Sequence, residues 1–420
     1  MPLLRNWRKK RVTKSNDKKV PALRFKGFTD DWEQRKLEDV AKIIGGGTPS
    51  TKIKEYWNGN INWYAPIEIG NQTFVSSSRK KISELGLKKS SAKLLPGGKT
   101  ILFTSRAGIG DMAIMKTDGS TNQGFQSWVV RSNLADVYFL YSLGKKLKKQ
   151  ALRKASGSTF LEISNSEVKK LLLFIPSFSE QKDISKVFKL IDKLISLQQR
   201  KLEQLNLLQR ALLQRIFANR NLQPDLRFTN FSGAWEQHKL GNMANILRGA
   251  SPRPIKDKKW FDTNSRIGWI RISDVTSQNG RVYTLGQHLS KKGQEKTHVV
   301  SSQTLLLSIA ASVGYPVITY VETGVHDGFI IFDKPKFNLD FMFFKLQSIQ
   351  NIWSKYGQPG SQVNINSSIV ANTSISIPNI KEQKKISILL KKIEENIHLQ
   401  QNKINKLQEL KRSFLQNIFI

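Results

Sequence analysis

Residues 23–420 carry one sequence written twice, and this duplication constrains the fold more than any other feature of the chain. The second copy begins about two hundred residues after the first, and the offset is 203 at the start, 204 to 206 in the middle and 202 at the end. The paired landmarks are Leu23-Arg24-Phe25 with Leu226-Arg227-Phe228, Trp32-Glu33-Gln34 with Trp235-Glu236-Gln237, Glu180-Gln181-Lys182 with Glu382-Gln383-Lys384, and Ile216-Phe217 with Ile418-Phe419. Such small changes in offset indicate loop insertions within one shared fold. Two homologous halves predict a pseudo-twofold body, which suits a target that also comes in two halves.

The charge of the chain points to a polyanionic partner. The sequence has 68 Lys and Arg residues against 32 Asp and Glu residues, a formal charge of +36 over 420 residues. An excess of this size indicates attraction to a polyanion, and nucleic acid is the leading candidate. The hydrophobic content of 39% is that of a globular protein. The length accommodates about two to four domains at roughly 100 to 200 residues each.

The composition also excludes several kinds of site. Cysteine is absent, so disulfides and thiolate metal sites are excluded, and the five histidines show no paired spacing typical of metal ligands. The first twenty residues carry eight Lys or Arg residues without the apolar core of a signal peptide. No apolar run approaches the length needed to span a bilayer. We therefore expect a cytoplasmic protein without a metal site or a membrane partner.

Each copy divides into a mixed globular part and a long helix. In the first globular part, residues 61–67, 100–105, 127–131 and 171–175 have the β-branched and aromatic composition of strands. A helical pattern covers residues 137–154, with a counterpart at residues 340–355. The second globular part repeats the scheme, with Trp269 at the place of Trp63. We expect both parts to be α+β.

The two long helices give the clearest local pattern. The first apolar stripe consists of Ile184, Phe188, Ile191, Ile195, Gln198, Leu202, Leu205, Leu212 and Ile216. Its partner consists of Ile386, Leu390, Ile393, Ile397, Gln400, Ile404, Leu407, Phe414 and Ile418. A period of 3.5 residues over about five heptads is typical of a coiled coil. The alternative is two separate amphipathic helices, each packed on its own domain.

Connectivity predicts the direction of the two helices. The first helix leaves the first globular domain and leads to the second, so under twofold symmetry the second helix must run back. The pair is then antiparallel and, at about 1.5 Å per residue, forms a rigid spacer of roughly 55 Å. Gln198 and Gln400 share one heptad position, and we expect them to meet near the pseudo-twofold axis and fix the register. The alternative places both side chains on a face turned to solvent or to a partner.

This order of parts resembles the specificity subunit of type I restriction-modification enzymes. The similarity covers nearly the whole chain from residue 23 onward. Its most specific marks are the paired openings Trp32 to Leu37 and Trp235 to Leu240, the paired exits Ile175 to Gln181 and Ile377 to Gln383, and the turn from Arg106 to Gly110. The resemblance implies a non-catalytic subunit with two target recognition domains, each contacting one half of a bipartite duplex DNA target.

The resemblance also implies partners and a domain plan. Two methyltransferase subunits would bind on the helices and two motor-nuclease subunits would complete the restriction enzyme. S-adenosylmethionine, ATP and magnesium are then expected on those partner subunits, and no cofactor is expected on this chain. The expected segments are a basic leader at residues 1–20, a first target recognition domain at 21–179, a spacer helix at 180–219, a second target recognition domain at 220–381 and a second spacer helix at 382–420. The leader has no equivalent before the second copy, and we assign it no role.

Some short motifs imitate enzyme sites. Gly97 to Thr100 resembles the end of a phosphate-binding loop, but the turn precedes a predicted strand and the second copy has Ser301 to Thr304 there. Asp225, Glu236 and Lys239 resemble part of a metal nuclease, but the spacing is wrong and the first copy has Ala22 in place of the aspartate. The Asn-Pro-Pro-aromatic motif of amino-methyltransferases is absent. Methyl transfer is therefore expected on another chain.

Candidate DNA-reading residues follow from side-chain chemistry and from the repeat. Specific readout needs side chains that donate to and accept from base edges, carried on loops over a rigid sheet. In the first copy the candidates are Thr48, Ser50, Lys52, Tyr64, Thr104, Ser105, Arg106, Asn122 and Gln123. In the second copy they are Ser251, Arg253, Lys256, Arg271, Ser273, Ser308, Ser312, His326 and Asp327. For each residue the alternative is a phosphate contact or a solvated loop position.

The two sets of candidate residues differ while the helix stripes match. Arg106 aligns with Ala310, Asn122 with His326, and Gln123 with Asp327. Such exchanges change which base edge is satisfied, so the two halves should read different short sequences. Two rival functions remain open: a basic coiled-coil scaffold that binds nucleic acid without reading it, and a self-sufficient DNA-modifying enzyme.

Overall fold

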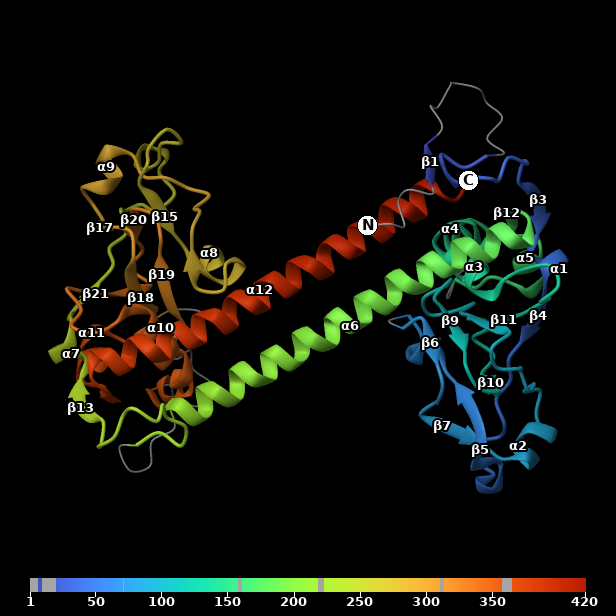
Figure 1. The fold of residues 1–420 in the computed structure, drawn as a ribbon, viewed down its shortest axis with the longest axis horizontal. Coiled ribbons are helices and arrows are strands. Elements are labelled where there is room, and N and C mark those ends of the chain that lie inside the picture. The colour runs from blue at the N-terminus through green and yellow to red at the C-terminus, as the bar shows by residue number, and fades with distance from the viewer. Residues whose placement is uncertain are drawn as a thin grey trace. The chain divides into compact units, whose positions relative to one another are not determined.

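The chain forms two compact units whose boundary falls inside two long helices (Figure 1). The computed structural model describes residues 7–9, 20–70, 72–157, 161–217, 223–309, 313–356 and 365–420. The first unit comprises Met1–Gln198 and Lys403–Ile420, and the second comprises Gln199–Asn402. Of the predicted leader, residues 1–20, only residues 7–9 and 20 are described; β1 (Trp7–Lys9) pairs antiparallel with β2 (Leu23–Phe25).

The first unit is built on a five-stranded sheet and a smaller three-stranded sheet. In spatial order the large sheet contains β4 (Ala41–Gly45), β11 (Gln126–Val130), β8 (Thr100–Phe103), β9 (Met112–Met115) and β6 (Phe74–Val75). The small sheet contains β10 (Gly119–Thr121), β5 (Trp57–Tyr64) and β7 (Lys80–Ile82), and a separate pair joins β3 (Glu33–Lys36) to β12 (Leu172–Ile175). The helices are α1 (Leu37–Val40), α2 (Glu84–Lys88), α3 (Val137–Ser142), α4 (Gly144–Lys154), α5 (Asn165–Lys169) and the start of α6 (Phe178–Phe217), with short 3₁₀ turns η2 (Lys54–Tyr56) and η3 (Pro66–Glu68).

The second unit repeats this topology. Its large sheet contains β14 (Asn245–Arg248), β21 (Phe329–Asp333), β18 (Thr304–Ser308), β19 (Pro316–Thr319) and β16 (Arg281–Val282). Its small sheet contains β15 (Gly268–Ile270), β20 (Thr323–Val325) and β17 (His298–Val300), and β13 (Glu236–Lys239) pairs with β22 (Ser374–Ile377). The helices are α7 (Leu240–Met243), α8 (Ile272–Ser277), α9 (Lys291–Gln294), α10 (Leu339–Ser348), α11 (Ser367–Asn372) and the start of α12 (Ile380–Asn417), with 3₁₀ segments η4 (Lys258–Trp260) and η5 (Gln350–Tyr356). The two units confirm the α+β prediction for both halves.

Each large sheet is buried on both faces, which explains its continuous apolar strands. Along β8, Ile101 and Phe103 pack into the core shared with the helices, whereas Leu102 packs into the core under the small sheet. The second unit repeats this in β18, where Leu305 packs toward the helices and Leu306 toward the small sheet. Successive side chains of a strand point to opposite faces, so a strand covered on both sides carries apolar residues at successive positions.

The motifs that mark the repeat are buried structural residues at the ends of the long helices. Glu180 accepts two hydrogen bonds from the Arg24 guanidinium, at 2.8 and 2.7 Å, and Glu382 accepts the same pair from Arg227, both at 2.8 Å. The next residue also repeats its contact: the Gln181 amide donates to the Pro176 carbonyl at 2.9 Å. Buried charges and amides need such partners. These motifs therefore anchor each unit to its helix.

In the first unit, segments of the two long helices run antiparallel. In the first unit the rings of Phe188 and Phe419 stack with centroids 5.8 Å apart, and Asp192 pairs with Lys411 at 2.5 Å. From the first contact to the second, the residue number increases along α6 and decreases along the C-terminal segment, as it does in an antiparallel pair. Every residue of the two predicted stripes is buried or half-buried. The predicted stripes are therefore confirmed as the inner faces of the helices.

Some predicted element boundaries are wrong. The strand predicted at residues 61–67 is β5, which ends at Tyr64, because Pro66 lacks the N–H needed by the ladder and starts η3. The helix predicted at residues 137–154 is divided into α3 and α4 at Leu143, next to the poor helix former Gly144. The predicted helix at residues 340–355 tightens into the 3₁₀ segment η5 after Ser348.

Candidate nucleic-acid interface

In the first unit, two polar segments meet where the small sheet joins the large sheet. The connecting loop, residues 122–124, leads from β10 to β11, and the glycine segment, residues 45–50, follows β4. The Gly47 N–H donates to the Thr121 carbonyl at 2.8 Å. A Cβ at Gly46 would lie 1.8 Å from the Asn122 carbonyl oxygen, so a larger residue would displace the loop. Glycine thus allows the two backbones to touch.

The second unit holds the same two segments in the same contact. Its connecting loop is residues 326–328, between β20 and β21, and its glycine segment is residues 248–253. The Ala250 N–H donates to the Val325 carbonyl at 2.9 Å, as Gly47 does in the first unit. A Cβ at Gly249 would lie 2.1 Å from the His326 carbonyl oxygen. The backbone scaffold is therefore duplicated together with the fold.

Different side chains make equivalent hydrogen bonds on this scaffold. The Thr48 hydroxyl donates to the Gln123 side-chain oxygen, and the Ser251 hydroxyl donates to Asp327 Oδ1 at 2.8 Å. The Gly124 N–H donates to Asn122 Oδ1 at 2.9 Å in the first unit. These pairs show that the repeat conserves geometry while it changes chemistry.

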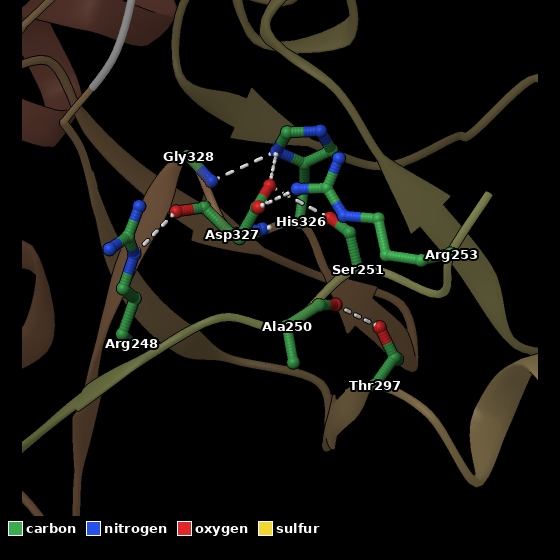
Figure 2. Close-up of polar contacts among 8 residues, drawn as sticks. All are labelled: Arg248, Ala250, Ser251, Arg253, Thr297, His326, Asp327 and Gly328. Carbon is green, nitrogen blue, oxygen red and sulfur yellow. Dashed lines mark hydrogen bonds and ion pairs between the residues drawn. The ribbon is translucent and has the colours of Figure 1, made fainter. Parts of the chain in front are cut away.

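The second unit adds two arginines to this arrangement (Figure 2). Arg253 Nη2 donates to Asp327 Oδ2 at 2.7 Å, and Arg248 Nε donates to the Asp327 carbonyl oxygen at 3.0 Å. The Arg253 side chain is 70% exposed despite this ion pair. It can therefore turn its remaining N–H groups to an anion such as a phosphate or to a base edge.

The charges of this cluster depend on one another. Burial acts to raise the pKa of Asp327, but the Ser251 hydrogen bond and the nearby His326, Arg253 and Arg248 outweigh it, so the pKa lies below its ordinary value. Burial lowers the pKa of His326; the Asp327 carboxylate opposes this effect, and Arg253 and Arg248 reinforce it. At neutral pH the cluster therefore holds an ionised Asp327 beside a neutral imidazole.

A cleft of about 770 Å³ lies beside the connecting loop of the second unit. It is lined by Ile255, Lys256, Lys258, Phe261, Asp262, Thr263, Trp269, Arg271, Gly286, Gln287, His288 and His326. The rings of Trp269 and His326 lie with centroids 5.5 Å apart. Trp269 is almost completely buried, so the accessible rings of the cleft are those of Phe261 and the histidines. Basic side chains beside such rings are typical of nucleic-acid contacts.

The structure brings together about half of the predicted DNA-reading residues. Thr48, Asn122 and Gln123 meet in the first unit, and Ser251, Arg253, Lys256, Arg271, His326 and Asp327 gather around the loop and cleft of the second. Lys52 and Ser273 are exposed outside these clusters, and Ser50 is exposed at the end of the glycine segment. Arg106 is exposed and pairs with Glu162 at 2.8 Å beside another cleft of about 910 Å³. Ser312 lies outside the described residues.

Four predicted DNA-reading residues are wrong because their side chains are fully buried. Tyr64 packs in the core under the small sheet, where burial raises the pKa of its hydroxyl. The Thr104 hydroxyl donates to the Gly108 carbonyl at 2.6 Å and so closes a turn, and Ser308 Oγ accepts from the Tyr315 N–H at 3.1 Å. Ser105 is also buried, and its N–H donates to the Gly124 carbonyl at 2.8 Å. In this fold the four side chains lie in the interior, behind the loops.

Sequence reasoning missed Arg248, Trp269 and His288. Arg248 is aligned with Gly45, so the exchange of glycine for arginine inside a duplicated segment was an available signal. Trp269 matches Trp63 in the repeat, and its side chain is almost completely buried behind the cleft that it lines. His288 lies in the cleft because it forms an isolated bridge with Gly268, a pairing that local sequence does not indicate.

The described residues form neither a metal site nor a membrane-spanning helix. Within the ranges that the structure describes, His, Asp and Glu side chains form no group of three or more that could hold a metal ion. Among the same residues, no helix combines the length and the apolar character required to cross a membrane.

Two units of one topology, holding one loop scaffold with different polar side chains, define a duplicated recognition protein. The chain belongs to the family of type I restriction modification DNA specificity domains, because the model of that family matches residues 29–207 and again residues 233–409. The two matches correspond to the two copies of the repeat.

Individual relatives of the chain are also specificity subunits of type I restriction enzymes. The chain is 31% identical over 255 residues to the type I restriction enzyme MjaIX specificity subunit of Methanocaldococcus jannaschii, and the match covers 58% of each protein. It is 21% identical over 409 residues to the MjaVIII specificity subunit of the same organism, covering 92% of this chain and 91% of that one. The fold is similar to the crystal structure of a type I S subunit from M. genitalium, with a TM-score of 0.62, 13% identity, and coverage of 96% and 99%.

Proposed function

We propose that this chain is the specificity subunit of a type I restriction-modification enzyme and recognises an asymmetric bipartite target in duplex DNA. The observation that carries the proposal is the duplicated loop scaffold, on which Thr48, Asn122 and Gln123 are replaced by Ser251, His326 and Asp327. Because the two loop backbones are alike, they would bind two DNA segments in the same way. Because their donors and acceptors differ, they would read different bases in each segment. The formal charge of +36 supports binding to the phosphate backbone.

The proposed subunit acts without catalysing a reaction of its own. It directs two methyltransferase subunits and two motor-nuclease subunits to its target in the cytoplasm, and these partners carry S-adenosylmethionine, ATP and magnesium. Membership of the specificity family supports this division of labour. The predicted segments, two target recognition domains at residues 21–179 and 220–381 with spacer helices at 180–219 and 382–420, are part of the proposal.

The long helices would set the spacing of the two half-sites. Both halves of the target must be reached from one side of the duplex, so their centres should lie about one helical turn apart, near 10 bp. The α6 helix has 40 residues and α12 has 38, enough for a spacer of roughly 55 to 60 Å at about 1.5 Å per residue. Removing one heptad from each helix should then alter the spacing and leave the half-sites intact.

The test is to map methylated positions after expression of the chain with its methyltransferase partners. The expected result is one asymmetric sequence with two read segments separated by unread bases. Replacing residues 23–179 with a second copy of residues 226–381 should convert this target into a palindrome at nearly unchanged spacing. A contiguous target, or a native target that is already palindromic, would contradict the proposal.

A further inference from the structure

The first side chain of each connecting loop bonds back to its own loop. In the first unit Asn122 Oδ1 accepts the Gly124 N–H at 2.9 Å, and in the second His326 Nδ1 receives the Gly328 N–H at the same distance (Figure 2). Side-chain bonds to the backbone two residues on fix both the turn and the side-chain rotamer. Two unlike residues thus occupy one conformation.

This bond leaves the opposite side of each side chain as a hydrogen-bond donor. The Asn122 oxygen accepts the Gly124 hydrogen bond, and the Nδ2 group of the same amide can only donate. Within the part of the chain that the structure describes, neither Asn122 Nδ2 nor His326 Nε2 has a hydrogen-bond partner. Both residues are partly exposed, and His326 lines the basic cleft of the second unit.

The protonation of His326 follows from its neighbours. Nδ1 lies 2.9 Å from the Gly328 nitrogen and 3.0 Å from Asp327 Oδ1. The contact with the Gly328 N–H requires Nδ1 without a proton, whereas the contact with Asp327 requires Nδ1 with one. Asp327 Oδ1 already accepts a hydrogen bond from the Ser251 hydroxyl, and burial with Arg253 and Arg248 lowers the pKa of His326. The first unit makes the same turn with an oxygen that can only accept. The imidazole is therefore neutral, with its proton on Nε2.

The backbone around both donors is held in place. Gly46 and Gly249 lie so close to the Asn122 and His326 carbonyls that a Cβ would come within 1.8 and 2.1 Å. The second residue of each connecting loop, Gln123 or Asp327, accepts a hydrogen bond from a hydroxyl of the glycine segment. A donor fixed before binding loses little rotamer freedom when it meets its acceptor, which favours discrimination over adaptation.

These contacts lead to an inference that rests on the proposed function. We infer that Asn122 and His326 are equivalent specificity-determining residues, each presenting one fixed N–H donor to one base of its half-site. Acceptors on the major-groove edge are guanine N7 and O6, adenine N7 and thymine O4, whereas cytosine presents only a donor. Each residue therefore rejects cytosine at its position.

The decisive variant is Asn122→Asp, which keeps the turn and reverses the reading group. One aspartate oxygen still accepts the Gly124 N–H, while the other places an acceptor where the donor stood. The probe is a duplex library randomised across one half-site, methylated by the full complex and sequenced. We expect the preference at one base pair to shift by about 5- to 150-fold toward bases with an amino donor, cytosine or adenine, with other positions unchanged.

The matched control is Asn133→Asp, the same change of charge at an exposed position beyond the far end of β11. It should leave every base preference unaltered. In the second unit, His326→Phe keeps the ring beside Trp269 but removes both nitrogens, so discrimination at one base pair of the other half-site should fall, while His326→Asn should retain part of it.

Each outcome has a clear meaning. An unchanged target for Asn122→Asp, or an equal loss of binding on all sequences, would overturn the assigned role. A wild-type complex that methylates no bipartite sequence would instead defeat the proposed function and this inference with it. A bipartite wild-type target with unaltered variants would leave the proposed function standing and remove the inference alone.

Discussion

At the residue scale, two lysines close the C-terminal ends of the long helices. Lys345 is buried and donates to the Phe217 carbonyl near the end of α6 at 3.4 Å, and Lys146 donates to the equivalent Phe419 carbonyl at 2.7 Å. A cation at a helix C-terminus satisfies unpaired carbonyls and the helix dipole. Lys345 also lies over the rings of Phe217 and Trp235, with centroid distances of 5.5 and 5.8 Å.

Lys345 should make the stability of the second unit depend on pH. Burial lowers the pKa of Lys345 from 10.5 to about 8, so the folded state disfavours the charged form. The unfolded chain binds the extra proton between these values, and the free energy of unfolding should therefore rise as pH increases from about 8 to about 10.5, by up to about 3 kcal/mol. Lys345→Met should lack this rise in denaturant unfolding measured from pH 7 to pH 10.5. The other titrating groups are common to both proteins, so parallel pH profiles would refute the role of Lys345.

At the element scale, each long helix has a carboxylate that contacts a side chain of the globular part in the same unit. Asp192 on α6 accepts a hydrogen bond from the Tyr138 hydroxyl, and Glu394 at the equivalent place on α12 pairs with Arg281 at 2.5 Å. Arg281 is buried and also pairs with Asp340 at 2.7 Å. Removing one member of such a partly buried pair leaves its partner without compensation and should lower stability.

The predicted meeting of Gln198 and Gln400 belongs to this scale. Gln400 is buried and Gln198 is half-buried, in line with their heptad positions. Because the chain has no cysteine, a double variant Gln198→Cys with Gln400→Cys can be tested for disulfide formation without other changes. A disulfide requires Cα atoms within about 7 Å, so we expect rapid cross-linking on oxidation.

The control places the second cysteine eight residues away, as Gln198→Cys with Gln408→Cys, a shift of about 12 Å along the helix. This pair should remain reduced. Faster cross-linking of the control than of the Gln198 and Gln400 pair would show that the two helices have another register. The two glutamines could then not be the residues that fix it.

At the scale of the whole molecule, the charge of +36 over 420 residues should dominate affinity. Each phosphate neutralised by the protein contributes a slope of about −0.9 in log K against log salt concentration. Duplex binding by the chain should therefore weaken steeply with salt, with a slope near −5 for about six phosphate contacts. Titration at several salt concentrations measures the slope, and binding that ignores salt would be incompatible with the proposal. Competition with duplex RNA separates a DNA reader from a general basic scaffold, because only the scaffold should bind both equally.

The sequence alone determined the parts of this protein that repeat or that have a period. The duplication predicted two units of one topology, and the 3.5-residue period predicted two long helices with buried stripes, because both features are written along the chain. The motif residues Trp32, Glu180 and Gln181 marked the repeat, but their function as buried anchors became visible only in the structure.

Tertiary structure decided which polar residues can reach a ligand. Thr104, Ser105 and Ser308 have the same chemistry as Thr48 and Ser251, yet their side chains are buried at the ends of strands covered on both faces. Burial depends on which distant segments pack over a strand, and no local period encodes that. The same holds for Asn122 and His326, whose shared conformation was hidden because an amide and an imidazole look unlike in sequence. The repeat had already aligned the two residues, but their equal bonds to a backbone N–H two residues away, and the close glycine about 76 residues earlier in the chain, became visible only in the folded chain.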